Sequence, residues 1–281
     1  MSPQISKALT RTAGFRSGSQ QHARGRTVRA RMRKGAGFVA WPAALTFLLV
    51  VVWQLVVELA DISPTVLPAP SAIASAIADN RVELLQQTWP TLLEIVVGFG
   101  IAVVAGVLTA IVVTAVPVID KMVRPLLVAS LVVPKIAIAP LFVLWFGFGY
   151  APKILVTAVI AYFPIVVDTA LGLSSLPREM RMLMRSMGAG RVRSFFKITF
   201  PNALPNVFAG LKVGMALAVV GAIVAEFVQS SQGLGFLLLQ ANQNLDTALF
   251  FGGIAILTVL GVILYVAIEL IETLALRSRK G

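Results

Sequence analysis

Long apolar stretches alternate with short polar ones along most of this chain. Six of these stretches have about the 20 residues that a helix needs to cross a hydrocarbon core of about 30 Å. Backbone polar groups inside a bilayer must be hydrogen-bonded within their own segment, so each stretch is expected to be a helix. We therefore predict an all-α, polytopic membrane protein with six transmembrane helices. The predicted spans are residues 38–59, 91–119, 126–145, 154–173, 207–228 and 247–275.

A polar, basic interruption separates spans four and five. It covers residues 177–205 and is called the basic segment below. Its first part predicts a short amphipathic helix with Pro177 in the first turn and Gly188 at the C-terminal stop. A second short helix is expected at residues 191–199, ended by Pro201 and Pro205. The apolar positions of the first helix recur at i, i+3, i+4 and i+7 and are Met180, Leu183, Met184 and Met187.

The methionines of this helix leave two interpretations open. Flexible thioether side chains suit a surface that fits another protein. Alternatively, the methionines lie on the membrane surface, as in other interfacial amphipathic helices. Either interpretation requires the helix to stand at the edge of the membrane rather than inside it.

The second half of the basic segment resembles a known pattern. It matches the G-x9-I-x-L-P half of the "EAA" loop, the signature of permease subunits of bacterial ABC importers, with Phe in the place of Leu. The matching residues are Gly188, Ile198, Phe200 and Pro201, while Met182, Leu183 and Met184 occupy the places of Glu-Ala-Ala. The resemblance implies that the loop is a coupling helix docking into a cleft on a separate ATPase subunit. The coupling residues expected are Met180, Leu183, Met184, Met187, Gly188, Ile198 and Pro201.

Further short motifs follow one another in an order similar to that of the nitrate, sulfonate, taurine and pyrimidine-precursor permeases, over about residues 40–274. They are 91–94, 98–100, Pro134, Ala137, 140–141, 144–149 and 233–235. The resemblance implies two permease subunits, expected to be a homodimer, with an ATPase dimer below and a soluble substrate-binding protein above. It also implies import of a small polar or anionic solute across the bacterial inner membrane.

The basic residues are distributed unevenly, and this predicts the orientation. Of 24 Lys and Arg, nine precede the first span, two lie between spans two and three, six between spans four and five, and three follow the sixth. By the positive-inside rule, both termini and the basic segment are predicted to be cytoplasmic. The net charge of +12 is then mostly an orientation signal, and no nucleic-acid partner is expected.

Composition agrees with this picture, since 58% of the residues are hydrophobic and 13% are charged, against about 25% charged in soluble domains. Residues 1–36 are rich in Arg, Ser and Gly and contain no acid, so we predict a disordered basic cytoplasmic tail before a membrane-embedded permease domain at 37–281. The tail also has the composition of an organelle transit peptide.

Ionisable residues within spans are costly in a bilayer and are therefore functional candidates. Glu94 and Glu226 are candidates for the pathway or for contacts on the outer side, and Glu226 is expected to accept hydrogen bonds from the 233–235 turn. The alternative for these two residues and for Lys135 is that they snorkel to an interface or cap a helix. Asp168 either braces the basic segment by pairing with Arg178 or Arg181, or is a solvated charge at a helix end.

Prolines and glycines inside the spans have different expected roles. Pro134 and Pro140 are expected to kink their helix and line the translocation pathway, and Pro164 to kink another. Gly210 and Gly214 form a G-x-x-x-G pair that favours close helix packing.

The sequence contains no motif typical of catalysis, nucleotide binding or metal binding. The chain lacks the G-x-x-x-x-G-K-[ST] phosphate loop, so ATP hydrolysis is expected on a partner, and neither a cofactor nor a metal site is predicted. The single histidine, His22, lies in the tail. A stand-alone secondary transporter remains an alternative, which would favour inverted repeats and paired acids midway in the bilayer. A membrane scaffold or enzyme is disfavoured, because no nucleophile has a base beside it.

Overall fold

The computed structural model describes residues 41, 44–116, 122, 125, 129, 133–228 and 230–277. It contains two compact units, Met1–Ile62 and Ser63–Gly281. The described part of the first unit is mainly the apolar helix Ala44–Leu59. The predicted tail lies outside the described residues and stays a prediction.

The second unit opens with two helices, α2 (Pro70–Asp79) and α3 (Arg81–Ala115). Asn80 ends α2 as its C-cap residue, and the Asn80 N–H bonds to the carbonyl of Ala76. The start predicted for span two is wrong, because α3 begins at Arg81 and runs through Pro90. The polar residues of its first turns extend the helix beyond the apolar stretch on which the prediction rested.

The next described elements are the 3₁₀ helix η1 (Lys135–Ile138), α5 (Ala139–Phe146) and α6 (Tyr150–Ser174). Pro134 is the N-cap of η1, and Pro140 lies in the first turn of α5. Both prolines therefore start short helical pieces instead of kinking one long helix. In the other part of predicted span three, residues 126–128 and 130–132 lie outside the described residues.

The basic segment forms α7 (Arg178–Ser186), α8 (Arg191–Ser194) and the π-helical turn η2 (Phe195–Thr199), followed by α9 (Phe200–Val228). Pro201 and Pro205 do not end a helix here, so that expectation is wrong. Pro201 is the second residue of α9, directly after the π-helical turn, and the helix continues through Pro205.

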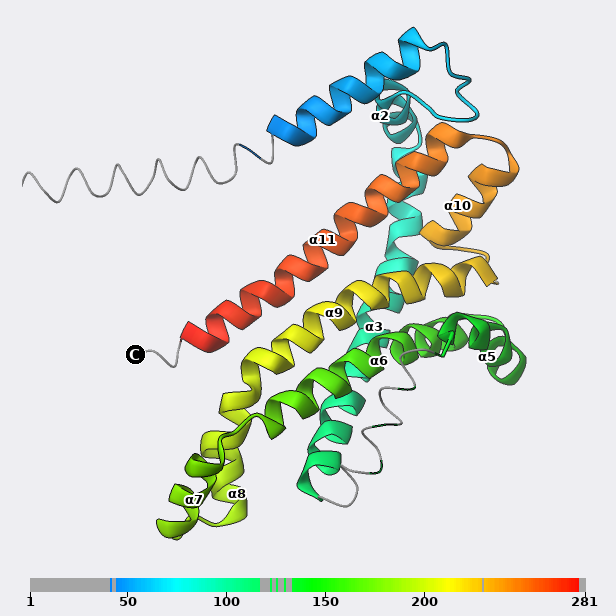
Figure 1. The fold of residues 1–281 in the computed structure, drawn as a ribbon. Coiled ribbons are helices and arrows are strands. Elements are labelled where there is room, and N and C mark those ends of the chain that lie inside the picture. The colour runs from blue at the N-terminus through cyan, green and yellow to red at the C-terminus, as the bar shows by residue number, and fades with distance from the viewer. Residues whose placement is uncertain are drawn as a thin grey trace, which may run out of the picture. The chain divides into compact units, whose positions relative to one another are not determined.

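The chain ends with α10 (Leu234–Gln243) and α11 (Thr247–Arg277), shown in orange and red in Figure 1. The sequence did not predict α10, because its ten residues are too few for a span and it follows a glycine turn directly. In α11 only Gly252 and Gly253 are buried, and the rest of this apolar helix is half-buried or exposed.

Helices α3, α6 and α9 build the core of the second unit, and α6 and α9 run side by side in Figure 1. The packing role predicted for the G-x-x-x-G pair is confirmed. A Cβ atom on Gly210 would lie 2.9 Å from the Asp168 Cβ atom, and one on Gly214 would lie 2.8 Å from the Ile165 Cγ1 atom. One buried core cluster comprises Ile95, Phe99, Ala102, Ala161, Ile165, Met215, Ala218 and Ala222.

Among the described residues, four helices are long and apolar enough to cross a membrane: Arg81–Ala115, Tyr150–Ser174, Val192–Val228 and Thr247–Arg277. The described parts of the other two predicted spans are the shorter helices Ala44–Leu59 and Lys135–Phe146. The all-α membrane fold is confirmed, whereas the count of six spans stays a prediction.

Candidate functional site

The first part of the basic segment forms the expected helix, α7, closed by a glycine, although α7 begins at Arg178 and Pro177 lies directly before it. Gly188 has a φ of +70°. The N–H of Ala189 bonds to the Met184 carbonyl at 3.1 Å, and that of Met187 to the Leu183 carbonyl at 3.0 Å. The bond from Ala189 to Met184 is the 6→1 bond of a Schellman cap, which requires a left-handed residue at the position of Gly188.

The apolar positions of α7 do not all point the same way. Met180, Leu183 and Met187 are 42%, 56% and 76% exposed, and they are called the α7 stripe below. Met184 is only 6% exposed, so it faces the protein rather than an outside partner. At 100° per residue Met184 lies at the edge of the amphipathic face nearest the other helices, and it packs inward there. The structure therefore separates it from the three residues with which it was grouped.

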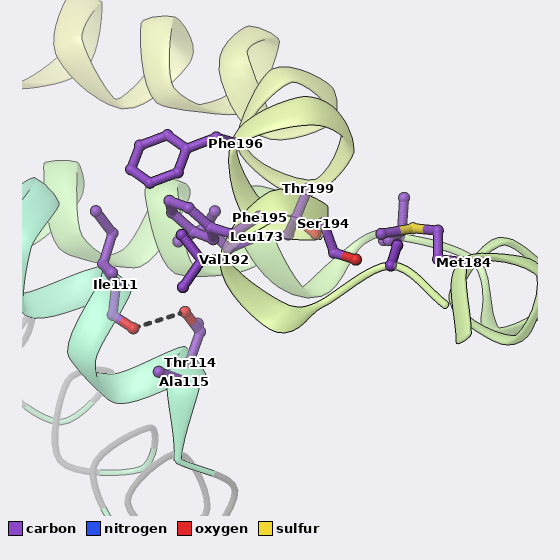
Figure 2. A pocket seen from close by; sticks show the side chains of 12 residues that line it. Ile111, Thr114, Ala115, Leu173, Met184, Val192, Ser194, Phe195, Phe196 and Thr199 are labelled. Atoms are coloured by element: carbon purple, nitrogen blue, oxygen red, sulfur yellow. Dashed lines mark hydrogen bonds between the residues drawn. The ribbon is translucent and has the colours of Figure 1, made fainter. Parts of the chain in front are cut away.

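Met184 contributes to a cavity of about 450 Å³ at the base of the basic segment (Figure 2). The Thr114 hydroxyl is used within its own helix, donating to the Ala110 carbonyl at 2.7 Å, which leaves the lining largely apolar. The rings of Phe195 and Phe196 meet edge to face, with centroids 5.2 Å apart. The cavity is lined by Ile111, Thr114 and Ala115 from α3, by Leu173 and Leu176 near the end of α6, and by Met184, Ala189, Val192, Ser194, Phe195, Phe196 and Thr199.

Two other predicted coupling residues, Ile198 and Pro201, lie on later elements of the basic segment and not on the α7 stripe. Ile198 is half-buried in η2, and Pro201 is half-buried in the first turn of α9. Phe196, two residues before Ile198, is 67% exposed. The predicted set thus divides into an exposed stripe on α7 and the more buried residues Met184, Ile198 and Pro201.

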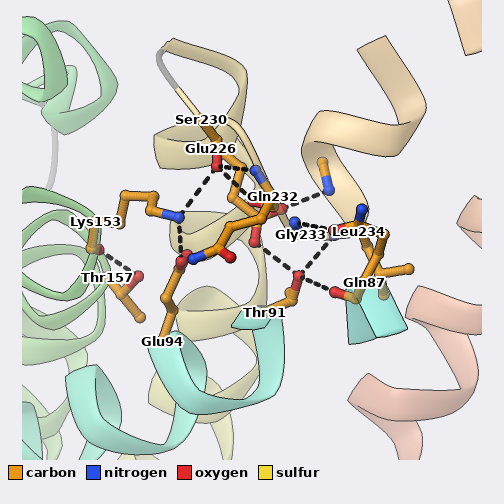
Figure 3. A network of polar contacts seen from close by, with 11 residues as sticks. Gln87, Thr91, Glu94, Lys153, Thr157, Glu226, Ser230, Gln232, Gly233 and Leu234 are labelled. Atoms are coloured by element: carbon orange, nitrogen blue, oxygen red, sulfur yellow. Dashed lines mark hydrogen bonds and ion pairs between the residues drawn. The ribbon is translucent and has the colours of Figure 1, made fainter. Parts of the chain in front are cut away.

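At the other end of α6 a group of polar side chains is buried between the helices (Figure 3). We call it the polar cluster, and it comprises Gln87, Thr91, Glu94, Lys153, Glu226 and Ser230 with the backbone of 233–235. Glu94 on α3 and Lys153 on α6 form an ion pair, and their side chains are 0% and 4% exposed. The Lys153 ammonium also donates to the Ser230 hydroxyl at 3.1 Å.

The other half of the polar cluster holds the turn between α9 and α10. Glu226 accepts hydrogen bonds from the Gly235 N–H and, at 2.7 Å, from the Thr91 hydroxyl. Thr91 in turn accepts the Leu234 N–H at 2.8 Å. The Gly233 N–H bonds to the Gln87 side-chain carbonyl at 2.6 Å. The expected contact between Glu226 and this turn is confirmed for Gly235.

The turn also requires glycine at both of its glycine positions. A Cβ atom on Gly233, whose φ is +113°, would lie 2.1 Å from the Glu226 Oε1 atom. A Cβ atom on Gly235 would lie 2.7 Å from the Glu226 Oε2 atom. The carboxylate therefore approaches the backbone at a distance that only glycine permits.

The burial of Glu94 and Glu226, both 0% exposed, removes the alternative that they snorkel to an interface. The sequence alone predicts no role for Lys153, Thr91 or Gln87. A buried acid needs a compensating cation or donor, and this requirement is the signal that could have directed a search toward Lys153.

Two other candidate charges lie apart from the polar cluster. The Lys135 ammonium lies 4.9 Å from the ring centroid of Phe163 on α6. Asp168 is half-buried on α6, opposite Gly210 of α9. Its expected pairing with Arg178 or Arg181 involves side chains outside the described part of the structure and stays a prediction.

Comparisons with known proteins bear directly on this arrangement. The family described as "Binding-protein-dependent transport system inner membrane component" matches residues 102–275. The chain belongs to this family of ABC importer permeases. The match contains the basic segment, Lys153 and Glu226, while Glu94 and Thr91 lie just before it.

Individual relatives cover most of the permease. A probable ABC transporter permease protein of Haemophilus influenzae is 34% identical over 81% of this chain and 93% of its own length. The formylaminopyrimidine transport permease protein ThiX of Halalkalibacterium halodurans is also 34% identical, over 85% of this chain and 96% of its own. The taurine transport system permease protein TauC of Escherichia coli is 27% identical over 80% and 84% of the two chains.

Membership of the family establishes the general role of the permease. It is a multi-pass inner-membrane protein of an importer for small solutes, and it is a transport protein rather than an enzyme. The family implies two kinds of partner, an ATPase and a substrate-binding protein.

Proposed function

We propose that this permease is driven by ATP hydrolysed on a separate pair of ATPase subunits, and that α7 is the helix that docks into them. The observation that carries the proposal is the α7 stripe, whose three large apolar side chains are 42–76% exposed on a short helix fixed by a glycine cap. Exposed apolar groups on a polar, basic segment mark a surface that another protein covers. The alternative placement of the stripe, on the membrane surface, becomes an outcome of the experiment.

The orientation proposed for the permease places the basic segment and both termini in the cytoplasm. Six Lys and Arg lie between predicted spans four and five. Because α6 connects Lys153 to α7, the polar cluster is proposed to lie on the outer side. That side is the one from which a binding protein delivers the solute.

The proposed transporter contains two copies of this chain, since a closed two-fold pair is the commonest arrangement of identical subunits. Closure of the ATPase pair on ATP would push on α7 and rock the helices from inward-open to outward-open. The solute proposed is small and polar or anionic, of the nitrate, sulfonate, taurine or pyrimidine-precursor type. Relatives that carry the words taurine and formylaminopyrimidine in their names support this range.

The experiment is reconstitution of the permease with the ATPase that co-purifies with it. Uptake of taurine, nitrate and formylaminopyrimidine into proteoliposomes would be measured with ATP, with a non-hydrolysable ATP analogue, and with an ion gradient alone. Uptake that needs ATP hydrolysis and a binding protein supports the proposal. Uptake that an ion gradient drives without any ATPase would contradict it and indicate a secondary transporter.

A further inference from the structure

Helix α6 precedes the basic segment and helix α9 follows it. The end of each helix that is far from the basic segment lies at the polar cluster. Helix α6 carries Lys153 in its first turn and ends at Ser174, just before α7 begins. Helix α9 starts directly after η2 and carries Glu226 in its last turn. With 25 residues, α6 is about 37 Å long at 1.5 Å per residue. The polar cluster and α7 therefore lie at opposite ends of the helix pair α6 and α9.

Between these ends α6 and α9 are packed too closely to slide independently. A Cβ atom on Gly172 of α6 would lie 2.7 Å from the Asn206 Cβ atom of α9. One on Gly221 of α9 would lie 3.0 Å from the Thr157 Cα atom of α6. Together with Gly210 and Gly214, these two glycines are distributed along the interface between α6 and α9. Closely packed interiors transmit displacement because they deform little.

At the far end, the contacts of Lys153 join three elements. Its ammonium pairs with Glu94 of α3 and donates to Ser230, which lies in the turn after α9. The Ser230 hydroxyl donates to the Gln232 carbonyl and accepts the Gln232 N–H at 3.2 Å. Lys153 is thus the side chain of α6 that holds both α3 and the α9–α10 turn.

We propose that Lys153 is a positioning residue of the transport cycle, which fixes the α9–α10 turn to α3 and α6 so that displacement of α7 reaches this turn. The inference rests on the proposed function, because it requires a partner that pushes on α7. It goes further in assigning a role to a residue far from the basic segment. Glu94 has no other ionic partner among the described residues, so loss of Lys153 leaves a buried carboxylate that the helices must separate to hydrate.

A cavity of about 300 Å³ lies beside Lys153, lined also by Phe148, Gly149 and 230–232. It is not assigned as an anion site, because Glu94 already neutralises the ammonium and a second carboxylate, Glu226, lies in the same cluster. The space instead gives the turn room to move when its contacts with Lys153 are broken. This agrees with a positioning role.

The test compares Lys153→Met, Lys153→Arg and the exchanged pair Lys153→Glu with Glu94→Lys in the reconstituted complex with ATPase and binding protein. The readout is the number of solute molecules imported per ATP hydrolysed in assembled complexes, which a change in the amount of folded protein does not alter. We expect Lys153→Met to lower this ratio at least about tenfold. Lys153→Arg and the exchanged pair should recover most of it.

Two further variants keep the inference falsifiable if Lys153→Met fails to insert. Ser230→Ala removes the second contact of Lys153, together with the bonds between Ser230 and Gln232, without leaving a buried charge, and should lower the ratio several-fold. Arg81→Gln, an exposed cation in the first turn of α3, is the matched control and should leave the ratio unchanged. A normal ratio in Ser230→Ala, or in an inserted Lys153→Met, would overturn the inference. A failure of the proposed function would be recognised separately from a failure of this inference. In that case the wild-type complex itself would already show import that is not coupled to ATP hydrolysis.

Discussion

The α7 stripe offers a quantitative test of docking, because its exposed apolar side chains lie on one side of the helix. Complete burial of a Leu or Met side chain is worth about 1.5–3 kcal/mol. Leu183 is 56% exposed, so a partner that covers it gains about 1–2 kcal/mol. In Leu183→Asp this gain is lost, and burying an unpaired polar group adds about 1–3 kcal/mol. The affinity for the ATPase should fall about 100-fold, at about 1.4 kcal/mol per factor of ten.

The matched control is Met182→Asp. Met182 is 65% exposed and lies about 100° around the helix from Leu183, outside the α7 stripe. This variant should weaken ATPase binding less than about tenfold, which is the loss of affinity expected when a single contact outside the centre of an interface is changed. Equilibrium binding of purified ATPase to the solubilised permease measures both variants. An affinity for Leu183→Asp within about threefold of wild type, or equal losses in the two variants, would refute the reasoning.

Other variants test other parts of the structure. Gly188→Val should weaken ATPase binding but not membrane insertion, because a Cβ at a φ of +70° costs about 1–2 kcal/mol although the space around it is open; a pull-down with an insertion assay measures this. Glu226→Gln should insert normally but change how uptake depends on binding-protein concentration, and an unchanged titration would make Glu226 a passive charge. Gly214→Val should lower the thermal unfolding midpoint, since a Cβ there already lies 2.8 Å from the Ile165 Cγ1 atom and overpacking costs about 1–3 kcal/mol. Deletion of residues 2–30 should reduce correct insertion but preserve uptake per inserted molecule; complete loss of that uptake would contradict a dispensable tail.

Features governed by local sequence could be predicted. The cap at Gly188 follows from the end of an apolar period at a glycine, and the packing glycines follow from their four-residue spacing. The contact of Glu226 with the 233–235 turn was also predictable, because an acid close in sequence to a glycine turn can reach its N–H groups. Each of these features depends on residues that lie within about ten positions of one another.

Features that depend on distant segments could not be predicted in the same way. Thr91 and Glu226 are 135 positions apart, and nothing in either neighbourhood indicates the other. Lys153 stands near the end of an apolar stretch, where a lysine normally reaches water, so its burial becomes visible only once α3 lies beside α6. The inward turn of Met184 likewise depends on Leu173 and Leu176, which a helical period does not locate.

The continuous helix through Pro201 and Pro205 shows a different limit. Proline usually ends a helix because it lacks an N–H group and its ring clashes with the preceding turn. Here the π-helical turn Phe195–Thr199 precedes Pro201 and changes the hydrogen-bond register before the proline is reached. Sequence patterns based on a period of 3.6 residues do not register such a turn.

The two ends of α6 are proposed to face different partners, and site-directed crosslinking distinguishes these partners. The chain contains no cysteine, so Leu183→Cys and Phe148→Cys each introduce a single reactive thiol, at positions 56% and 77% exposed. A short thiol-to-amine crosslinker would be applied to membranes that contain the complete transporter. We predict that Leu183→Cys joins the permease to the ATPase and that Phe148→Cys joins it to the binding protein. Capture of the ATPase from position 148, or its absence at position 183 in a transporter that hydrolyses ATP, would contradict the account.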